Sequence, residues 1–153
     1  MSTSPTLHAT AVLIGAHAVL IRGPSGAGKS RLALDLIQAS GSALPFARLV
    51  GDDRVHVEAA GTRLLVRPAA TLAGLLEVRG LGIRRLAYEP VAQIGLIVDL
   101  AAPDAVRLPA DTSETASISG VILPRLPVAP GEAALPLILA WRTTAPQVSP
   151  SGS

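Results

Sequence analysis

Residues 23–30 read GPSGAGKS and fit the pattern GxxxxGK[ST], which is typical of a loop that binds phosphate. Glycines let the backbone turn its N–H groups inward, and the start of the helix expected after the loop attracts anions. We therefore expect Lys29 to reach the β- and γ-phosphates of a nucleotide, and the Ser30 hydroxyl to bind Mg²⁺. The predicted nucleotide-binding residues are Gly23, Pro24, Ser25, Gly26, Ala27, Gly28, Lys29 and Ser30.

The basic residue of this loop is a lysine, whereas every other basic residue of the chain is an arginine. The chain holds 13 basic residues, and Lys29 is its only lysine. A compact ammonium group on a flexible stem can reach between phosphate oxygens, where a planar guanidinium group cannot. Its presence in a chain that otherwise uses arginine supports the phosphate-binding interpretation.

Two adjacent carboxylates, Asp52 and Asp53, follow Gly51 and the short strand expected at residues 48–50, which read RLV. Carboxylates at the end of a strand can hold Mg²⁺ or take a proton from a nucleophile. Such a pair is common in turns, but its position downstream of the glycine-rich loop makes it a catalytic candidate.

A third stretch, residues 77–83, reads EVRGLGI. Its two glycines predict a tight loop in which the backbone closely approaches a ligand, and Glu77 and Arg79 place opposite charges there. The residues alone leave an alternative open, in which a helix ends in a glycine cap beside a surface ion pair of little energy.

The elements that must position these residues are mostly strands. Apolar runs predict strands at 9–14, 18–22, 48–50, 91–100 and 121–126, and residues 55–59 and 62–66 flank a turn and predict a hairpin. Helices are expected at 30–38, at 69–76 after Pro68, and at 132–142. We predict an α/β fold, P-loop-containing and strand-rich, rather than the regular strand–helix alternation of ordinary P-loop nucleotide kinases.

Composition narrows the class of protein. The 153 residues suit one domain, at 7–142, between flexible termini at 1–6 and 143–153. Aromatic residues make up 2% of the chain and the net charge is only +2, which argues against nucleic-acid binding. The N-terminal stretch has neither the basic start of a secretory signal nor the length of a membrane span. We therefore expect a cytoplasmic protein without membrane contact.

Together, GPSGAGKS, LVGDD and EVRGLGI resemble the C-terminal catalytic domain of the bacterial HPr kinase/phosphorylase family, whose motif reads close to E-[IV]-R-G-x-G-[IL]. The resemblance covers roughly residues 7–142. It implies a fold related to phosphoenolpyruvate carboxykinase and a kinase that uses ATP and Mg²⁺ to phosphorylate a serine of HPr, the phosphocarrier of the phosphotransferase system. It further implies possible phosphorolysis in reverse and a homo-oligomer, since the family's known assemblies are hexamers.

The resemblance also implies roles for individual residues. Ser30 and Glu77 would hold Mg²⁺, and one carboxylate of the aspartate pair would deprotonate the substrate serine, with Asp52 favoured. Arg107 is assigned by spacing alone. The implied catalytic residues are His8, Lys29, Asp52, Asp53, Arg79 and Arg107.

The chain also departs from the family pattern. The usual N-terminal domain is not in the sequence, which resembles the truncated form of alphaproteobacteria. Pro24 and Arg31 stand where many relatives have acids, and Glu132 replaces an arginine in a segment tied to the phosphorylase reaction. Two other functions stay open: a nucleotide sensor that catalyses little, and, with less support, a small-molecule kinase.

Overall fold

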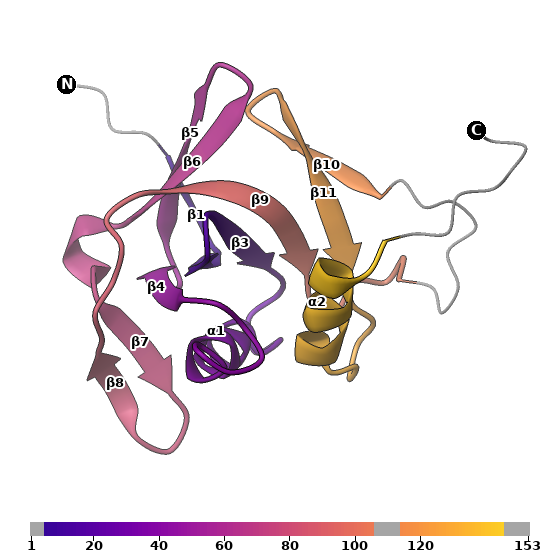
Figure 1. The fold of residues 1–153 in the computed structure, drawn as a ribbon. Coiled ribbons are helices and arrows are strands. Elements are labelled where there is room, and N and C mark those ends of the chain that lie inside the picture. Colours follow the sequence, from indigo (N-terminus) through magenta and orange to yellow (C-terminus); the bar gives the residue numbers. More distant parts are fainter. Residues whose placement is uncertain (1–4, 106–113, 146–153) are drawn as a thin grey trace, which may run out of the picture.

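The computed structural model describes residues 5–105 and 114–145 of the chain. Strands dominate this part, with two α-helices and one short 3₁₀ turn (Figure 1). In chain order the elements are β1 (Thr6–Leu7), β2 (Thr10–Ile14), β3 (His17–Arg22), α1 (Lys29–Gln38), β4 (Ala47–Gly51), β5 (Val55–Ala60), β6 (Arg63–Pro68), a 3₁₀ turn (Ala70–Leu72), β7 (Leu75–Val78), β8 (Gly82–Arg85), β9 (Ala92–Asp99), β10 (Thr115–Ile118), β11 (Val121–Pro127) and α2 (Ala134–Thr143).

Strand β9 organises the sheet, because it borders three other strands (Figure 1). It runs parallel to β3 along one edge, and the two strands end together at Arg22 and Asp99. Along its other edge, the start of β9 pairs with β6 in the antiparallel sense and its end pairs with β11 in the parallel sense. The sheet continues from β3 through β2 to β4, and from β6 through β5 to β1. The ends of β3 and β9 therefore lie side by side where the glycine-rich loop begins.

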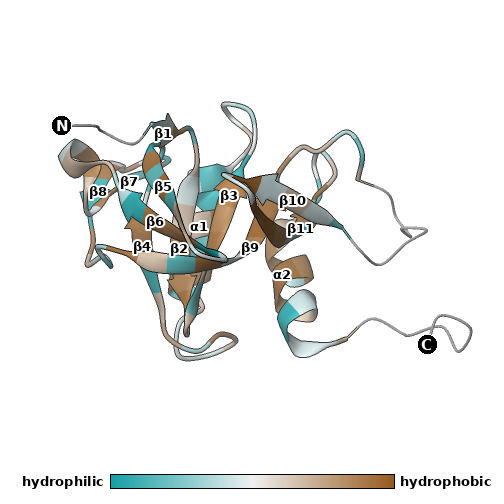
Figure 2. Ribbon diagram, turned by 90° about the horizontal axis from the view of Figure 1, so that it is seen from above, coloured by the Kyte–Doolittle hydropathy of each residue, from teal (hydrophilic) through white to brown (hydrophobic). Residues whose placement is uncertain are grey.

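Both faces of the central strands are buried, which explains their nearly continuous apolar sequence. Helices α1 and α2 cover one face, where Leu36 and Ile138 pack against the sheet. The opposite face packs against the β5–β6 hairpin. Figure 2 shows β3 and β9 mostly in the brown of hydrophobic residues. Valine, leucine, isoleucine and alanine build this core, and the exposed large apolar side chains include Phe46, Tyr88 and Trp141.

The structure confirms most of the predicted elements. The hairpins at 9–22 and 55–66, the strand at 91–100 and the helices at 30–38 and 132–142 are present with small shifts at their ends. The predicted helix at 69–76 is wrong: only three residues form a 3₁₀ turn, and β7 begins at Leu75. Gly74 interrupts the stretch with a φ of 75°, outside the helical range, and a Cβ at that position would lie 3.0 Å from Cδ1 of Tyr88.

The stretch EVRGLGI forms the turn of a hairpin rather than a helix end. Strands β7 and β8 pair with each other and form a ribbon separate from the large sheet. The N–H of Leu81 donates to the carbonyl of Val78, which closes the turn, and Gly80 supplies the positive φ of 89° that the turn requires. No helix in the described parts of the chain has the length and apolar character needed to cross a bilayer.

Candidate active site

The glycine-rich loop lies between β3 and α1, as the sequence predicts. Gly26 and Gly28 take φ values of 82° and 98°, which side chains rarely allow. Gly28 precedes the first turn of α1, where no side chain caps the helix and no acidic residue is present. The backbone N–H groups of this turn are therefore available to an anion.

Lys29 is 7% exposed, so its stem is packed while its ammonium group stays at the loop. The Nζ atom donates to the carbonyl oxygens of Gly23 and Pro24, at 2.8 and 3.2 Å. An ammonium group has three donors, so these two bonds leave one for a phosphate oxygen. Both Lys29 and the N–H groups of the loop backbone can thus bind the same phosphate.

The carboxylate of Asp52 is buried, with 5% of the residue exposed, beneath the start of α1. It accepts hydrogen bonds from the Ser30 hydroxyl at 2.7 and 2.9 Å and from the Thr10 hydroxyl at 2.8 Å. The backbone N–H of Glu77 donates to it at 3.2 Å. Asp52 thereby connects the glycine-rich loop, β2 and the β7–β8 ribbon.

Asp53 has a different environment, although it is the next residue. Its φ of 71° turns the chain, and its side chain is 62% exposed. One carboxylate oxygen lies 2.9 Å from Nε2 of His8, and the N–H of Asp53 donates to the Thr10 hydroxyl at 3.3 Å. The adjacent carboxylates therefore face two different places: Asp52 faces the interior and Ser30, and Asp53 faces a cavity.

This cavity has a volume of about 510 Å³, within the usual range for small-molecule sites. It brings together predicted residues from four separate segments, and Arg107 lies outside the described residues. The lining residues are His8, Thr10, Ser25, Gly26, Gly28, Lys29, Ser30, Arg31, Leu34, Asp53, Glu77, Val78 and Arg79. Another cavity, of about 570 Å³, lies around His17, Gly95 and Trp141 and contains none of the predicted site residues. We place the site in the smaller cavity, because only there do charged groups and the glycine-rich loop converge.

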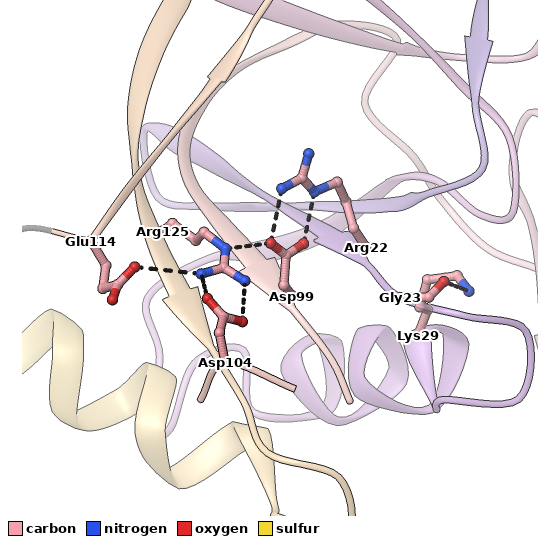
Figure 3. A network of polar contacts seen from close by, with 7 residues as sticks. All are labelled: Arg22, Gly23, Lys29, Asp99, Asp104, Glu114 and Arg125. Atoms are coloured by element: carbon pink, nitrogen blue, oxygen red, sulfur yellow. Dashed lines mark hydrogen bonds and ion pairs between the residues drawn. The ribbon is translucent and has the colours of Figure 1, made fainter. Parts of the chain in front are cut away.

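A network of charges holds the strand ends beside the loop (Figure 3). Asp99 accepts hydrogen bonds from Arg22 at 2.7 and 2.8 Å and from Arg125 at 2.5 Å. Arg125 also binds Asp104 through two nitrogens, at 2.8 and 3.0 Å, and reaches Glu114 at 3.4 Å. Since Arg22 directly precedes Gly23, the network anchors the first residue of the loop to β9 and β11.

The network shifts the pKa values of Asp99, Asp104 and Arg125. Burial by itself raises the pKa of Asp99, but hydrogen bonds and charge attraction from Arg22 and Arg125 outweigh it, so the pKa lies below its ordinary value. Hydrogen bonding to Arg125 lowers the pKa of Asp104, and the same contact raises the pKa of Arg125. Asp99, Asp104 and Arg125 are therefore charged at neutral pH.

The sequence did not reveal two contributors to the site. Thr10 is fully buried and its hydroxyl joins both aspartates. The only signal was a hydroxyl residue at the start of an apolar strand. Asp99 ends the longest apolar strand, and a charged residue at that point could have suggested a partner near the loop.

Comparison with known proteins identifies the family. The family model described as the HPr Serine kinase C-terminal domain matches residues 1–140. The chain belongs to this family.

The family's curated members include an HPr kinase/phosphorylase of Limosilactobacillus reuteri (strain DSM 20016), 40% identical over 135 residues, which are 80% of this chain and 40% of the relative. One from Streptococcus thermophilus (strain LMD-9) is 46% identical over 80 residues, which are 51% of this chain and 24% of the relative. The chain thus spans less than half the length of these two curated relatives.

A solved structure supports the same family at the level of the fold. The structure of the Hpr(Ser) kinase/phosphatase from Coxiella burnetii matches with a TM-score of 0.73 and 25% identity. The match covers 90% of this chain and 87% of that one. The predicted strand-rich α/β fold of this family is therefore confirmed.

Proposed function

We propose that the chain is an ATP- and Mg²⁺-dependent protein serine kinase whose substrate is an HPr-type phosphocarrier. One observation carries the proposal: Lys29, Ser30, Asp53, Glu77 and Arg79 line one cavity, in a chain of the HPr serine kinase family. Asp52 lies behind this lining and accepts the Ser30 hydroxyl. The curated relatives named HPr kinase/phosphorylase supply the substrate class.

We assign nucleotide binding to the loop and α1. The free N–H groups at the start of α1 and the Lys29 ammonium group would bind the β- and γ-phosphates and offset the charge that develops as the phosphoryl group moves. The cavity volume leaves room for the phosphates beside the side chain of the incoming serine.

The donor atoms around Ser30 fit a magnesium ion. Mg²⁺ prefers oxygen ligands and commonly takes one or two from protein and the rest from phosphates and water. The Ser30 hydroxyl and the Asp52 carboxylate lie within hydrogen-bond distance, and the Glu77 side chain lines the same cavity. Bound there, the ion would neutralise phosphate charge.

We propose Asp53 as the general base, in preference to Asp52, which the sequence favoured. Asp52 is buried and its oxygens already accept three partners, whereas Asp53 lines the cavity with its carboxylate exposed. The serine oxygen would attack the γ-phosphorus while Asp53 takes its proton, and the bond from the γ-phosphorus to the ADP oxygen would break. His8, 2.9 Å from Asp53, would hold that carboxylate in position.

Transfer from ATP to a serine of HPr tests the proposal. Purified full chain with labelled ATP, Mg²⁺ and HPr from the same organism should give phosphoserine, and Lys29→Ala should abolish it. Nucleotide binding without transfer to any HPr would overturn the proposal and favour the nucleotide-sensor alternative.

The remaining expectations stay predictions. We predict that the chain forms a homo-oligomer, which light scattering can measure. We also predict reverse phosphorolysis, which can be measured as the loss of phosphate from serine-phosphorylated HPr when inorganic phosphate is added. Cytoplasmic location and the absence of nucleic-acid and membrane partners rest on the sequence alone.

A further inference from the structure

The β7–β8 ribbon lies outside the large sheet, next to α1, at the lower left of Figure 1. Its β7 strand and turn contribute Glu77, Val78 and Arg79 to the wall of the candidate active site. The rest of the ribbon extends beyond the lining of that cavity. A ligand confined to the cavity therefore leaves most of the ribbon without a partner.

The register of the ribbon defines which face is free. Leu76 and Val78 pack on the core, and because side chains alternate along a strand, their face points inward. Glu77 pairs directly with Ile83, and Leu75 pairs with Arg85, so these four residues share the opposite, outward face. The same face thus carries a carboxylate at the cavity and an apolar and a basic side chain beside it.

This outward face, with Arg85, and the adjoining turn, with Arg79, combine exposed apolar and basic groups, and Arg84 is also exposed, on the face that it shares with Leu76. Leu81 at the turn is 67% exposed and Ile83 is 63% exposed. The side chains of Arg79, Arg84 and Arg85 make no hydrogen bond or ion pair with any residue in the described parts of the chain. Exposed apolar side chains beside unpaired charges are typical of a protein-interaction surface.

We propose that the β7–β8 ribbon is the docking surface for the protein substrate, which presents an apolar patch flanked by carboxylates next to its acceptor serine. The inference rests on the proposed kinase function and specifies how that site selects its substrate. Three guanidinium groups against the single carboxylate of Glu77 give the ribbon a positive charge, which attracts an acidic partner. Ile83 lies directly across from Glu77, which lines the cavity, so a protein that inserts a serine from the side of the ribbon lies close to Ile83.

Steady-state phosphorylation of HPr by the full chain tests this inference. Arg85→Glu on the outward face should raise the KM for HPr about fivefold at low salt, because charge reversal repels an acidic partner. Ile83→Ser should raise it about fivefold through loss of an apolar contact. In both variants kcat and nucleotide affinity should stay at the wild-type level, since none of these side chains lines the cavity. Added salt should raise the wild-type KM and have little effect on Arg85→Glu.

Matched controls lie on other hairpins. Arg63→Glu reverses an exposed arginine on β6 that forms no ion pair within residues 5–105 and 114–145, and Ile122→Ser removes a 71% exposed isoleucine on β11. Neither control should change the KM for HPr.

The possible failures are distinguishable. Absence of transfer by the wild-type chain would overturn the kinase function together with this inference. Transfer with an unchanged KM in the ribbon variants would overturn the docking surface alone. An unchanged KM with an altered oligomeric state would assign the ribbon to contacts between copies of the chain, and would also overturn the inference.

Discussion

Replacing Asp99 by asparagine tests the charge network that anchors the glycine-rich loop. The wild-type carboxylate accepts two hydrogen bonds from Arg22 and one from Arg125 (Figure 3). Asparagine has a similar shape but no charge, and its amide nitrogen would face a guanidinium group as donor against donor. Asp99→Asn therefore removes the ion pairs and leaves Arg22 without its partner.

Burial sets the magnitude of the loss. The side chains of Asp99 and Arg125 are 15% and 14% exposed, and that of Arg22 is 34% exposed. Removing one partner of a fully buried pair costs about 3–5 kcal/mol, whereas an exposed pair contributes about 0–1 kcal/mol. Arg125 keeps Asp104 and Glu114, and water can reach Arg22. We expect Asp99→Asn to lower the free energy of unfolding by about 2–3 kcal/mol at neutral pH.

The loss should depend on pH in a defined direction. The folded state holds the pKa of Asp99 below its ordinary value, so the unfolded chain binds this proton more readily. The stabilisation is therefore complete above the pKa of Asp99 in the unfolded chain, about 4. It disappears as pH falls through the lower pKa that Asp99 has in the folded state. The difference between wild type and Asp99→Asn should be largest at neutral pH and shrink progressively below about pH 4.

Urea unfolding followed by circular dichroism, in a pH series from neutral to acid, measures this difference. Glu58→Gln is the control, because its pair with Arg67 spans 3.6 Å and both side chains are about half exposed. The control should cost less than about 1 kcal/mol. Equal losses for the two variants, or a loss for Asp99→Asn that does not change with pH, would refute the reasoning.

Two further predictions concern the aspartate pair and its support. Asp52→Asn should raise the Mg²⁺ concentration needed for half-maximal transfer, whereas Asp53→Asn should lower kcat by about 10²–10⁴-fold and leave the Mg²⁺ requirement unchanged; identical effects in the two variants would contradict their separate roles. Gly51→Ala should destabilise the protein by about 1–3 kcal/mol and reduce kcat. Its added Cβ would lie 2.8 Å from Cγ1 of Val55 and 3.1 Å from Cα of Pro68, so the turn that carries both aspartates must move. A melting temperature and a kcat equal to those of the wild type would refute this tight packing.

The parts of the site that were predictable from sequence are those fixed by local chemistry. The glycine-rich loop needs positive φ at particular positions and a lysine beside a helix start, and these requirements are visible in eight consecutive residues. The apolar runs of β3 and β9 likewise indicate, from the sequence alone, that both faces of these strands are buried. The separate environments of Asp52 and Asp53 could not be predicted from the sequence, because they depend on residues more than 40 positions away. Thr10 donates to the carboxylate of Asp52, whereas His8 contacts the carboxylate of Asp53.

The failed helix at 69–76 has a similar cause. Leucine and alanine favour a helix there, but the pairing of Leu75 and Leu76 with Arg85 and Arg84 on β8 decides the structure. The course of β9, which passes from β6 to β11 along one edge, also depends on strands distant in sequence. Local propensity carries no information about such pairings.

Mass spectrometry of HPr after incubation with the chain, ATP and Mg²⁺ tests the central claim most directly. We predict one phosphoryl group on a single serine of HPr, dependent on ATP and Mg²⁺, and its loss when that serine is replaced by alanine. Asp53→Asn should bind the nucleotide with wild-type affinity and leave HPr unmodified on the wild-type timescale. Unmodified HPr with the wild-type chain, or full modification with Asp53→Asn, would contradict the account.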